Sequence, residues 1–348
     1  MSALTDVALG AGAKIGRYFN IVSVVPSLIF VIYVAGLLKA GAWEGSFSPA
    51  RAGAAIGTPD AASIAVLVTL AIGLGIVLHP LQFPITQVLE GYWGTTAVAN
   101  GLMEARIRHY RTTALRLIDK AEEHEAALTS TALATQRTEV AESMRRLSGP
   151  KLWAAVQQIA NTAAGDTLLP HIVRQDSARR ALGAYPSSVR RIRPTRLGNA
   201  LRSYEDLAGV QYSLKPIPIA THLSLVAEPD HVAYQADARQ QMDLSVRVCF
   251  LAVLATGVTS VLLASHGAWV LLALGPYLVA YLAYRGAVSA SHAYGTAVAT
   301  VLDLNRFRLY EHLHLPLPDT LQSEQEQNQA LLEVLRGGTS KLAYRHPI

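Results

Sequence analysis

The sequence predicts an all-α integral membrane protein with four transmembrane helices, arranged as two hairpins, and an all-helical cytoplasmic domain. Three observations lead to this fold class. Hydrophobic residues make up 51% of the chain and charged residues only 16%, whereas soluble domains carry about 25% charged residues. Charged residues are absent from three long stretches and normally dense elsewhere. Most of the 30 Lys and Arg residues lie on one side of the spans that these stretches predict.

The first hairpin is expected within residues 1–84, with spans at about 18–38 and 61–79. At 1.5 Å per residue, the first span just crosses a hydrocarbon core of about 30 Å. Pro26 lies inside this span, and we expect it to kink the helix, which bundled spans tolerate. His79 marks where the second span leaves the bilayer.

The first stretch has a second interpretation, as a signal peptide with Ala40-Gly41-Ala42 as its cleavage site. The apolar region of a signal peptide spans about 7–15 residues. This stretch is longer and is followed by Lys39, so the sequence favours a retained span. Cleavage would leave three spans and the same cytoplasmic part.

The second hairpin is expected within residues 244–284, where the stretch 248–284 contains no charged residue. As one helix this stretch would reach about 55 Å, far more than one crossing needs. Two short spans at about 248–264 and 268–284, joined by a tight turn, fit better. Cys249 lies in the first of these spans and is expected to pack there, and one cysteine forms no intramolecular disulfide.

The distribution of Lys and Arg predicts the orientation of the spans. Lys14 and Arg17 precede the first span, whereas the loop after it carries only Lys39 and Arg51 and the turn of the second hairpin carries neither residue type. Basic flanks stay in the cytoplasm. We therefore expect a multi-pass protein of the cell membrane with both termini cytoplasmic. Little chain remains outside, which excludes an extracellular catalytic or receptor domain.

Helices are expected in the cytoplasmic domain, residues 85–243, and in the helix and tail of residues 285–348. Apolar residues recur at three- and four-residue steps over 98–147, which predicts a long helix continuing from the second span. Residues 166–196, with three prolines, are interpreted as an irregular connection. Thr195 is a suitable N-cap for a helix that Gly209 ends.

Two further cytoplasmic helices are predicted to join the second hairpin directly. One begins at Pro229-Asp230 and runs unbroken into the third span. The other leaves the fourth span and continues over 284–315, until Pro316 stops it. A shorter helix is expected around 324–335, in the glutamine-rich tail. Pro216 and Pro218 are read as a break in the chain.

Two short segments suggest an internal repeat of one unit. Residues 90–99 follow the second span, and residues 293–299 follow the fourth with a similar sequence. In each copy a basic stretch ending in tyrosine follows, at Tyr110 and at Tyr310. The repeated unit would be a membrane hairpin whose second helix continues into the cytoplasm.

Candidate binding residues lie near the expected membrane surface. Four arginines within seven residues could hold anionic lipid headgroups or a phosphate-bearing ligand, or could pair with local acids: Arg190, Arg191, Arg193 and Arg196. Tyr92 and Trp93 occupy a position typical of an aromatic pair at the membrane interface.

The predicted spans contain hydroxyl side chains but no Asp, Glu, Lys or Arg. This composition disfavours an ion-coupled transporter, which usually keeps charged groups at the bilayer midplane. The hydroxyls could pack between helices or line a pore. The candidates are Ser23, Ser27, Thr69, Thr256, Thr259 and Ser260.

Motifs of known chemistry are missing from the sequence. It contains no phosphate-binding loop, no Gly-x-Ser-x-Gly and no His-Glu-x-x-His. We therefore expect no catalytic activity, no cofactor and no metal. The net charge of +5 is too modest to suggest nucleic acid as a partner. Two hypotheses remain: a membrane-anchored scaffold or signalling component that presents its helical domain to a cytoplasmic protein partner, or an oligomeric pore with a cytoplasmic vestibule. A homo-oligomer is expected under both.

Overall fold

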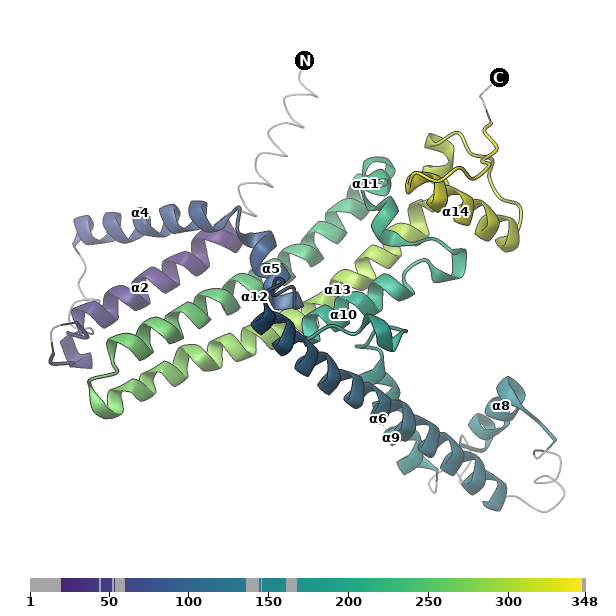
Figure 1. The fold of residues 1–348 in the computed structure, drawn as a ribbon, viewed down its shortest axis with the longest axis horizontal. Helices are drawn as coiled ribbons and strands as arrows, with labels where there is room; N and C mark the ends of the chain where they lie inside the picture. Colours follow the sequence, from purple (N-terminus) through teal and green to yellow (C-terminus); the bar gives the residue numbers. More distant parts are fainter. Residues whose placement is uncertain are drawn as a thin grey trace. The chain divides into compact units, whose positions relative to one another are not determined.

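A computed structural model of the chain describes residues 20–43, 45–51, 53, 60–135, 144, 146–160 and 168–345 (Figure 1). All secondary structure in these ranges is helical. Four of the helices are long and apolar enough to cross a membrane. The described part of the chain therefore has the all-α class that the sequence predicts. Lys14 and Arg17, on which the predicted orientation partly depends, lie outside the described residues.

The chain divides into two compact units. Unit 1 combines Met1–Trp93 with Tyr204–Ile348, and unit 2 comprises Gly94–Ser203. The apolar helices all belong to unit 1, together with the helices of the C-terminal region. The predicted division at residues 85 and 243 follows the expected membrane surface and stays a prediction.

The N-terminal apolar helices of unit 1 are α2, Val25–Lys39, and α4, Ala61–Leu78. A short π-helical segment, Asn20–Val24, precedes α2. Pro26 lies near the N-terminus of α2. Because the π-helical segment leads directly into α2, helical backbone lies on both sides of Pro26, and the kink expected there stays a prediction. The Asp60 side chain caps α4 by accepting a hydrogen bond from the Ser63 N–H at 3.3 Å.

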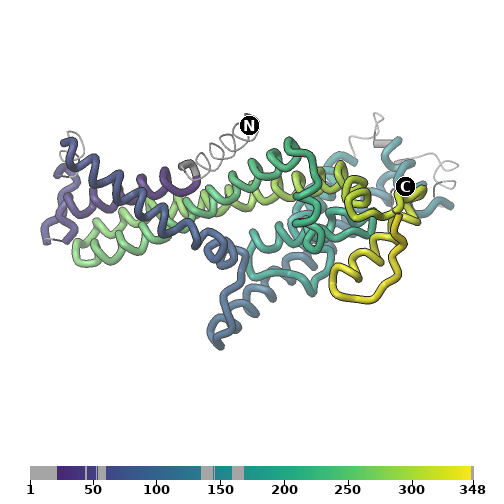
Figure 2. Tube along the Cα trace, turned by 90° about the horizontal axis from the view of Figure 1, so that it is seen from above, coloured from purple at the N-terminus to yellow at the C-terminus, as the bar shows by residue number. Residues whose placement is uncertain are grey.

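The C-terminal helices of unit 1 form one long antiparallel hairpin. Helix α12 runs unbroken over Pro229–Leu262, and after a turn and the 3₁₀ segment Gly267–Ala273 helix α13 runs over Leu274–His312. Both are continuous from their polar into their apolar halves, as the sequence predicts. Figures 1 and 2 show the two helices side by side along their length. Helix α2 lies beside the apolar half of α12, and α4 lies on the other side of α2 (Figure 1).

The polar end of the hairpin carries two more helices. Helix α11, Pro216–Val226, and helix α14, Leu321–Leu335, pack against α13 around a core that includes Ile219, Leu302 and Leu309. Pro216 occupies the first turn of α11, so it begins a helix where the sequence suggested only a break. The predicted helix at 324–335 corresponds to α14.

The connection after α4 differs from the prediction of one helix passing from the second span into the cytoplasm. Helix α5, Gln82–Glu90, ends at Gly91, whose φ of 99° lies in the left-handed region. Residues 92–96 are not helical, and α6 begins at Ala97. The repeat-like segment at 293–299, by contrast, is helical within α13. The two segments thus do not adopt one structure, and the predicted repeat of a continuous helix is wrong for its first copy.

Unit 2 contains α6, Ala97–Thr135, α8, Gly149–Ala160, and α9, Leu169–Leu182. The first two turns of α10, Arg196–Leu207, close the unit at Ser203. Helix α9 packs along α6 and lies in the stretch predicted to be irregular. The prediction was wrong because Pro170, taken as a breaker, occupies the first turn of α9, where proline is favoured.

Candidate functional site

The polar half of α12 meets its apolar half at a cluster of side chains that we call the junction cluster: Gln82, Arg239, Asp243, Arg247 and Tyr294. All five belong to unit 1. Arg239, Asp243 and Arg247 come from α12 at four-residue steps, so they share one face of the helix. Gln82 comes from α5 and Tyr294 from α13. Arg247 is the last charged residue before the apolar half of α12 begins at Val248.

Arg247 is completely buried. Its Nε donates a hydrogen bond to Gln82 Oε1 at 2.8 Å, and Gln82 Nε2 donates to the backbone oxygen of Asp243 at 3.1 Å. One glutamine amide therefore bridges α5 to two successive turns of α12. Because a buried guanidinium without acceptors carries a large desolvation penalty, this bridge fixes α5 strongly against α12.

Asp243 is almost completely buried and pairs with Arg239 on the same helix. Arg239 Nε lies 3.1 Å from Asp243 Oδ1 and 3.3 Å from Oδ2. The Arg239 guanidinium lies 5.4 Å from the ring centroid of Tyr294, a distance typical of a cation–π contact. Burial lowers the pKa of Arg239, but the Asp243 carboxylate and Tyr294 outweigh it, so the pKa ends above its ordinary value. The cluster thus combines two cationic arginines with one carboxylate.

The predicted hydroxyls do not gather in one place. Ser27 Oγ donates to the Ser23 backbone oxygen at 2.7 Å, and both residues are completely buried. Thr259 Oγ1 contacts Tyr33 Oη at 2.8 Å and also donates to its own helix. The hydroxyls of Thr256 and Ser260 donate to backbone oxygens one turn back on α12. The side chain of Thr69 is exposed on α4.

The predicted interface aromatics lie at the end of α5. Trp93 folds back so that its Nε1 donates to the backbone oxygen of Val88 at 2.8 Å. The Tyr92 N–H donates to the Gln87 oxygen at 2.9 Å, which completes the cap at Gly91. Tyr92 remains exposed. This backbone cap gives the aromatic pair a fixed position at the end of the helix.

The predicted basic run lies in unit 2, around the 3₁₀ turn Val189–Arg191. Arg190, Arg191 and Arg196 are exposed, whereas Arg193 is partly buried. The Asn199 side chain clamps the backbone of Arg193, accepting from its N–H at 2.6 Å and donating to its oxygen at 3.0 Å. Thr195 caps α10 through the Gly198 N–H, as predicted. The run is therefore held in a defined loop, and its role in lipid or anion binding stays a prediction.

The junction cluster was missed by the sequence analysis. Arg239, Asp243 and Arg247 were visible as polar residues on the predicted helix, but were taken as part of its polar side. Their four-residue spacing and their position directly before an uncharged stretch were the available signal. Gln82 gave no signal, because a lone glutamine near the end of a span is unremarkable in sequence.

In the part of the chain that the structure describes, no three His, Cys, Asp or Glu residues gather as metal ligands would. The junction cluster offers neither a nucleophile nor a metal site; its geometry can position helices and place positive charge at the start of the apolar helices. Comparisons with known proteins add no assignment: no family model, no curated protein and no solved structure matches this chain.

Proposed function

We propose that this protein is a membrane-anchored scaffold, without catalytic activity, that presents its helical cytoplasmic part to a protein partner. In this proposal the four apolar helices cross the cell membrane as two hairpins, and both termini are cytoplasmic. The observation that carries it is the continuity of α12 and α13, each of which extends from an apolar into a polar half. The same two helices then form part of the membrane anchor and part of the cytoplasmic surface.

The packing of unit 1 supports this proposal. Helices α11 and α14 cover the polar half of α13, and the junction cluster ties α5 to α12 at the boundary of the apolar half. A hairpin braced at both positions would hold the cytoplasmic surface at a fixed height above the bilayer. Such rigidity suits a scaffold, because preformed surfaces bind partners without a large ordering cost.

Single cysteines test the membrane topology. Cys249 is replaced by alanine, and one cysteine is introduced at Ser46, at His266 or at Ser188. An impermeant thiol reagent added to intact cells is expected to label the first two variants and not the third. Labelling of the third variant after permeabilisation controls for its reactivity. The reverse pattern in intact cells would overturn the proposed orientation.

Two measurements test the scaffold role against a pore. A photo-crosslinking residue at Leu225, which is 81% exposed on α11, is expected to give one discrete protein adduct in cells. The same residue at Ile64, on the exposed side of α4, should give no adduct with that partner. Purified protein in planar bilayers is expected to conduct no ions while its oligomer stays intact. Reproducible conductance by the purified oligomer would favour the pore instead.

A further inference from the structure

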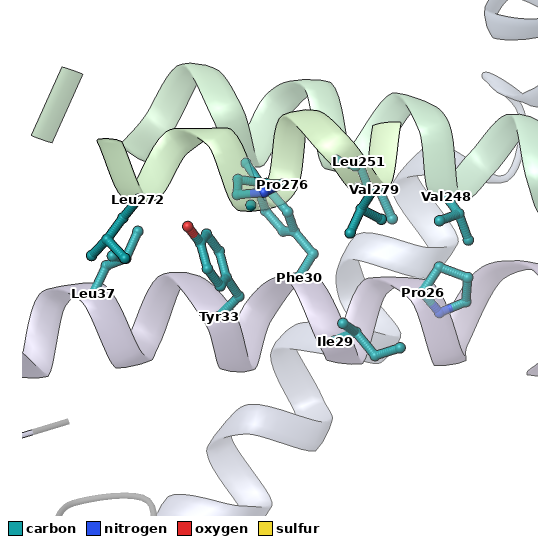
Figure 3. A pocket seen from close by; sticks show the side chains of 13 residues that line it. Pro26, Ile29, Phe30, Tyr33, Leu37, Val248, Leu251, Leu272, Pro276 and Val279 are labelled. Atoms are coloured by element: carbon teal, nitrogen blue, oxygen red, sulfur yellow. The ribbon is translucent and has the colours of Figure 1, made fainter. Parts of the chain in front are cut away.

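An apolar groove lies between the N-terminal helix α2 and the C-terminal hairpin (Figure 3). Phe30, Tyr33 and Leu37 point from α2 toward α12 and α13 in this view. The opposite wall is made by Val248 and Leu251 of α12 and, on the other helix, by Leu272, Pro276 and Val279. Every wall thus comes from a helix that is apolar enough to cross a membrane.

The groove offers its occupant no polar partner. The only hydroxyl among its lining side chains belongs to Tyr33, and that oxygen lies 2.8 Å from Thr259 Oγ1 on α12. An extended peptide placed here would leave its backbone N–H and C=O groups without hydrogen bonds, which costs several kcal/mol for each group in an apolar medium. The lining therefore selects for an occupant that is apolar along its whole length.

The dimensions of the groove suit a single hydrocarbon chain. Its volume is about 480 Å³. From Pro26 to Leu37 the helix rises about 16 Å. The space open to the centre of a water molecule is therefore about 6 Å wide on average, which leaves about 9 Å between the surfaces of the two walls. A helix of a second copy is about 10–12 Å across with its side chains. Carbon atoms pack about 4 Å apart, so a row of methylene groups fits this width, and a length of about 16 Å matches half of a hydrocarbon core.

We propose that this groove binds one acyl chain of a bilayer phospholipid. The proposal rests on the membrane placement given under the proposed function. Lipid tails are as apolar as the groove, so van der Waals packing drives binding, and no gain from leaving water contributes. An empty groove forfeits those contacts on both of its walls. The bound chain completes the packing of α2 against α12 and α13, and so joins the two hairpins.

A matched pair of glycine substitutions tests the proposal. Gly275 lines the groove, and a β-carbon added there would meet no atom within 4 Å. Gly275→Leu therefore fills the groove without a clash at its base. Gly257 lies on α12, is not part of the lining, and also has open space at its β-carbon. Gly257→Leu is the control, because it makes the same change on an exposed helix surface.

Native mass spectrometry of the full chain, extracted in a mild detergent, measures the phospholipid that each protein retains. The wild type and Gly257→Leu are expected to retain one phospholipid, and Gly275→Leu is expected to lose it. Equal retention by all three proteins would overturn the proposal. So would loss of a dimer in Gly275→Leu with unchanged lipid, because the occupant would then be a second copy.

Photo-crosslinking of the wild type gives a test that needs no variant. The protein is reconstituted into phosphatidylethanolamine and phosphatidylglycerol vesicles with a photoreactive acyl chain, extracted into detergent and then irradiated. Adducts are expected at Phe30 and Val279, and not at Val253, which is exposed on α12 outside the groove. Adducts at Val253 alone would overturn the groove assignment. Failure of the wild-type chain to stay in membranes after an alkaline wash would instead overturn the membrane placement itself.

Discussion

The ring of Tyr204 lies directly against the backbone of Gly295, so closely that a β-carbon built on Gly295 would be 2.0 Å from Tyr204 Cγ. Tyr204 comes from the last turns of α10, and Gly295 lies in the middle of α13. The Tyr204 hydroxyl also lies 3.2 Å from Nδ1 of His292, one turn earlier on α13. The backbone of Gly295 has an ordinary helical conformation that any residue could adopt. Glycine is required at residue 295 because the Tyr204 ring occupies the space that a β-carbon would need.

Gly295→Ala is expected to destabilise unit 1 by about 1–3 kcal/mol, the usual cost of overpacking. Alanine has a higher helix propensity than glycine, so without a clash this substitution should raise the stability. A loss of stability would therefore show that the added methyl group clashes with Tyr204. Thermal unfolding in detergent measures the effect. Gly286→Ala is the matched control on α13, because its β-carbon would lie 3.6 Å from Ser245 Oγ, an ordinary contact. Equal melting temperatures for the two variants would contradict the close approach of Tyr204.

His292 is expected to make stability depend on pH. Burial lowers its pKa from the ordinary value of 6.5, so the unfolded chain takes up a proton there more readily than the folded chain. Stability should then be lost as pH falls through about 6.5, the unfolded-state value, and continue to fall until the folded pKa is reached. Melting temperatures measured across this range should show a shallower dependence for His292→Gln. The exposed His222→Gln serves as control, and identical profiles for both variants would refute the role of His292.

The helices of the hairpin could be predicted because their signals are local. An uncharged stretch too long for one span, with a small polar turn in it, led to α12 and α13, and Pro316 marked the end of α13. Proline was misread elsewhere for a physical reason. Pro170 and Pro216 both stand in the first turn of a helix, where proline is favoured, so a proline can mark the start of a helix as well as its end.

The candidate site could not be predicted, because it depends on which helices pack together. Arg247 looks like any basic residue at the edge of a span until α5 places Gln82 beside it. Gly91 and Gly94, both with positive φ, separate α5 from α6. The chain contains 25 glycines, so a glycine in the sequence does not by itself indicate the end of a helix. The groove likewise depends on tertiary packing, since its walls come from residues 26–37 and 248–279.

The Gln82 bridge is expected to contribute strongly to stability. Gln82→Leu removes the acceptor of a completely buried Arg247 Nε, which should cost about 1–3 kcal/mol. The double variant Gln82→Leu with Arg247→Met should be more stable than the single variant, because replacing both partners leaves no buried charge without its acceptor. Thermal unfolding of the variants compares them, with Gln87→Leu on α5 as control. A double variant less stable than the single one would refute this account.

Helix α14 is expected to detach from α13 when its buried carboxylate is removed. Glu324 Oε1 accepts hydrogen bonds from Arg306 Nε at 2.9 Å and from the Tyr310 hydroxyl at 3.1 Å. Tyr310 is completely buried, and burial raises the pKa of its hydroxyl, so the hydroxyl stays a proton donor.

Glu324→Ala leaves both donors without this acceptor and should cost about 1–3 kcal/mol. Asn328, which accepts from the Tyr310 hydroxyl at 2.9 Å, can hold only part of the contact. Because the loss falls on one helix, hydrogen exchange over residues 321–335 should quicken more than exchange in α12. Glu326→Ala removes an exposed carboxylate of the same helix and should leave exchange unchanged. Equal protection of α14 in both variants would mean that apolar packing alone holds the helix in place.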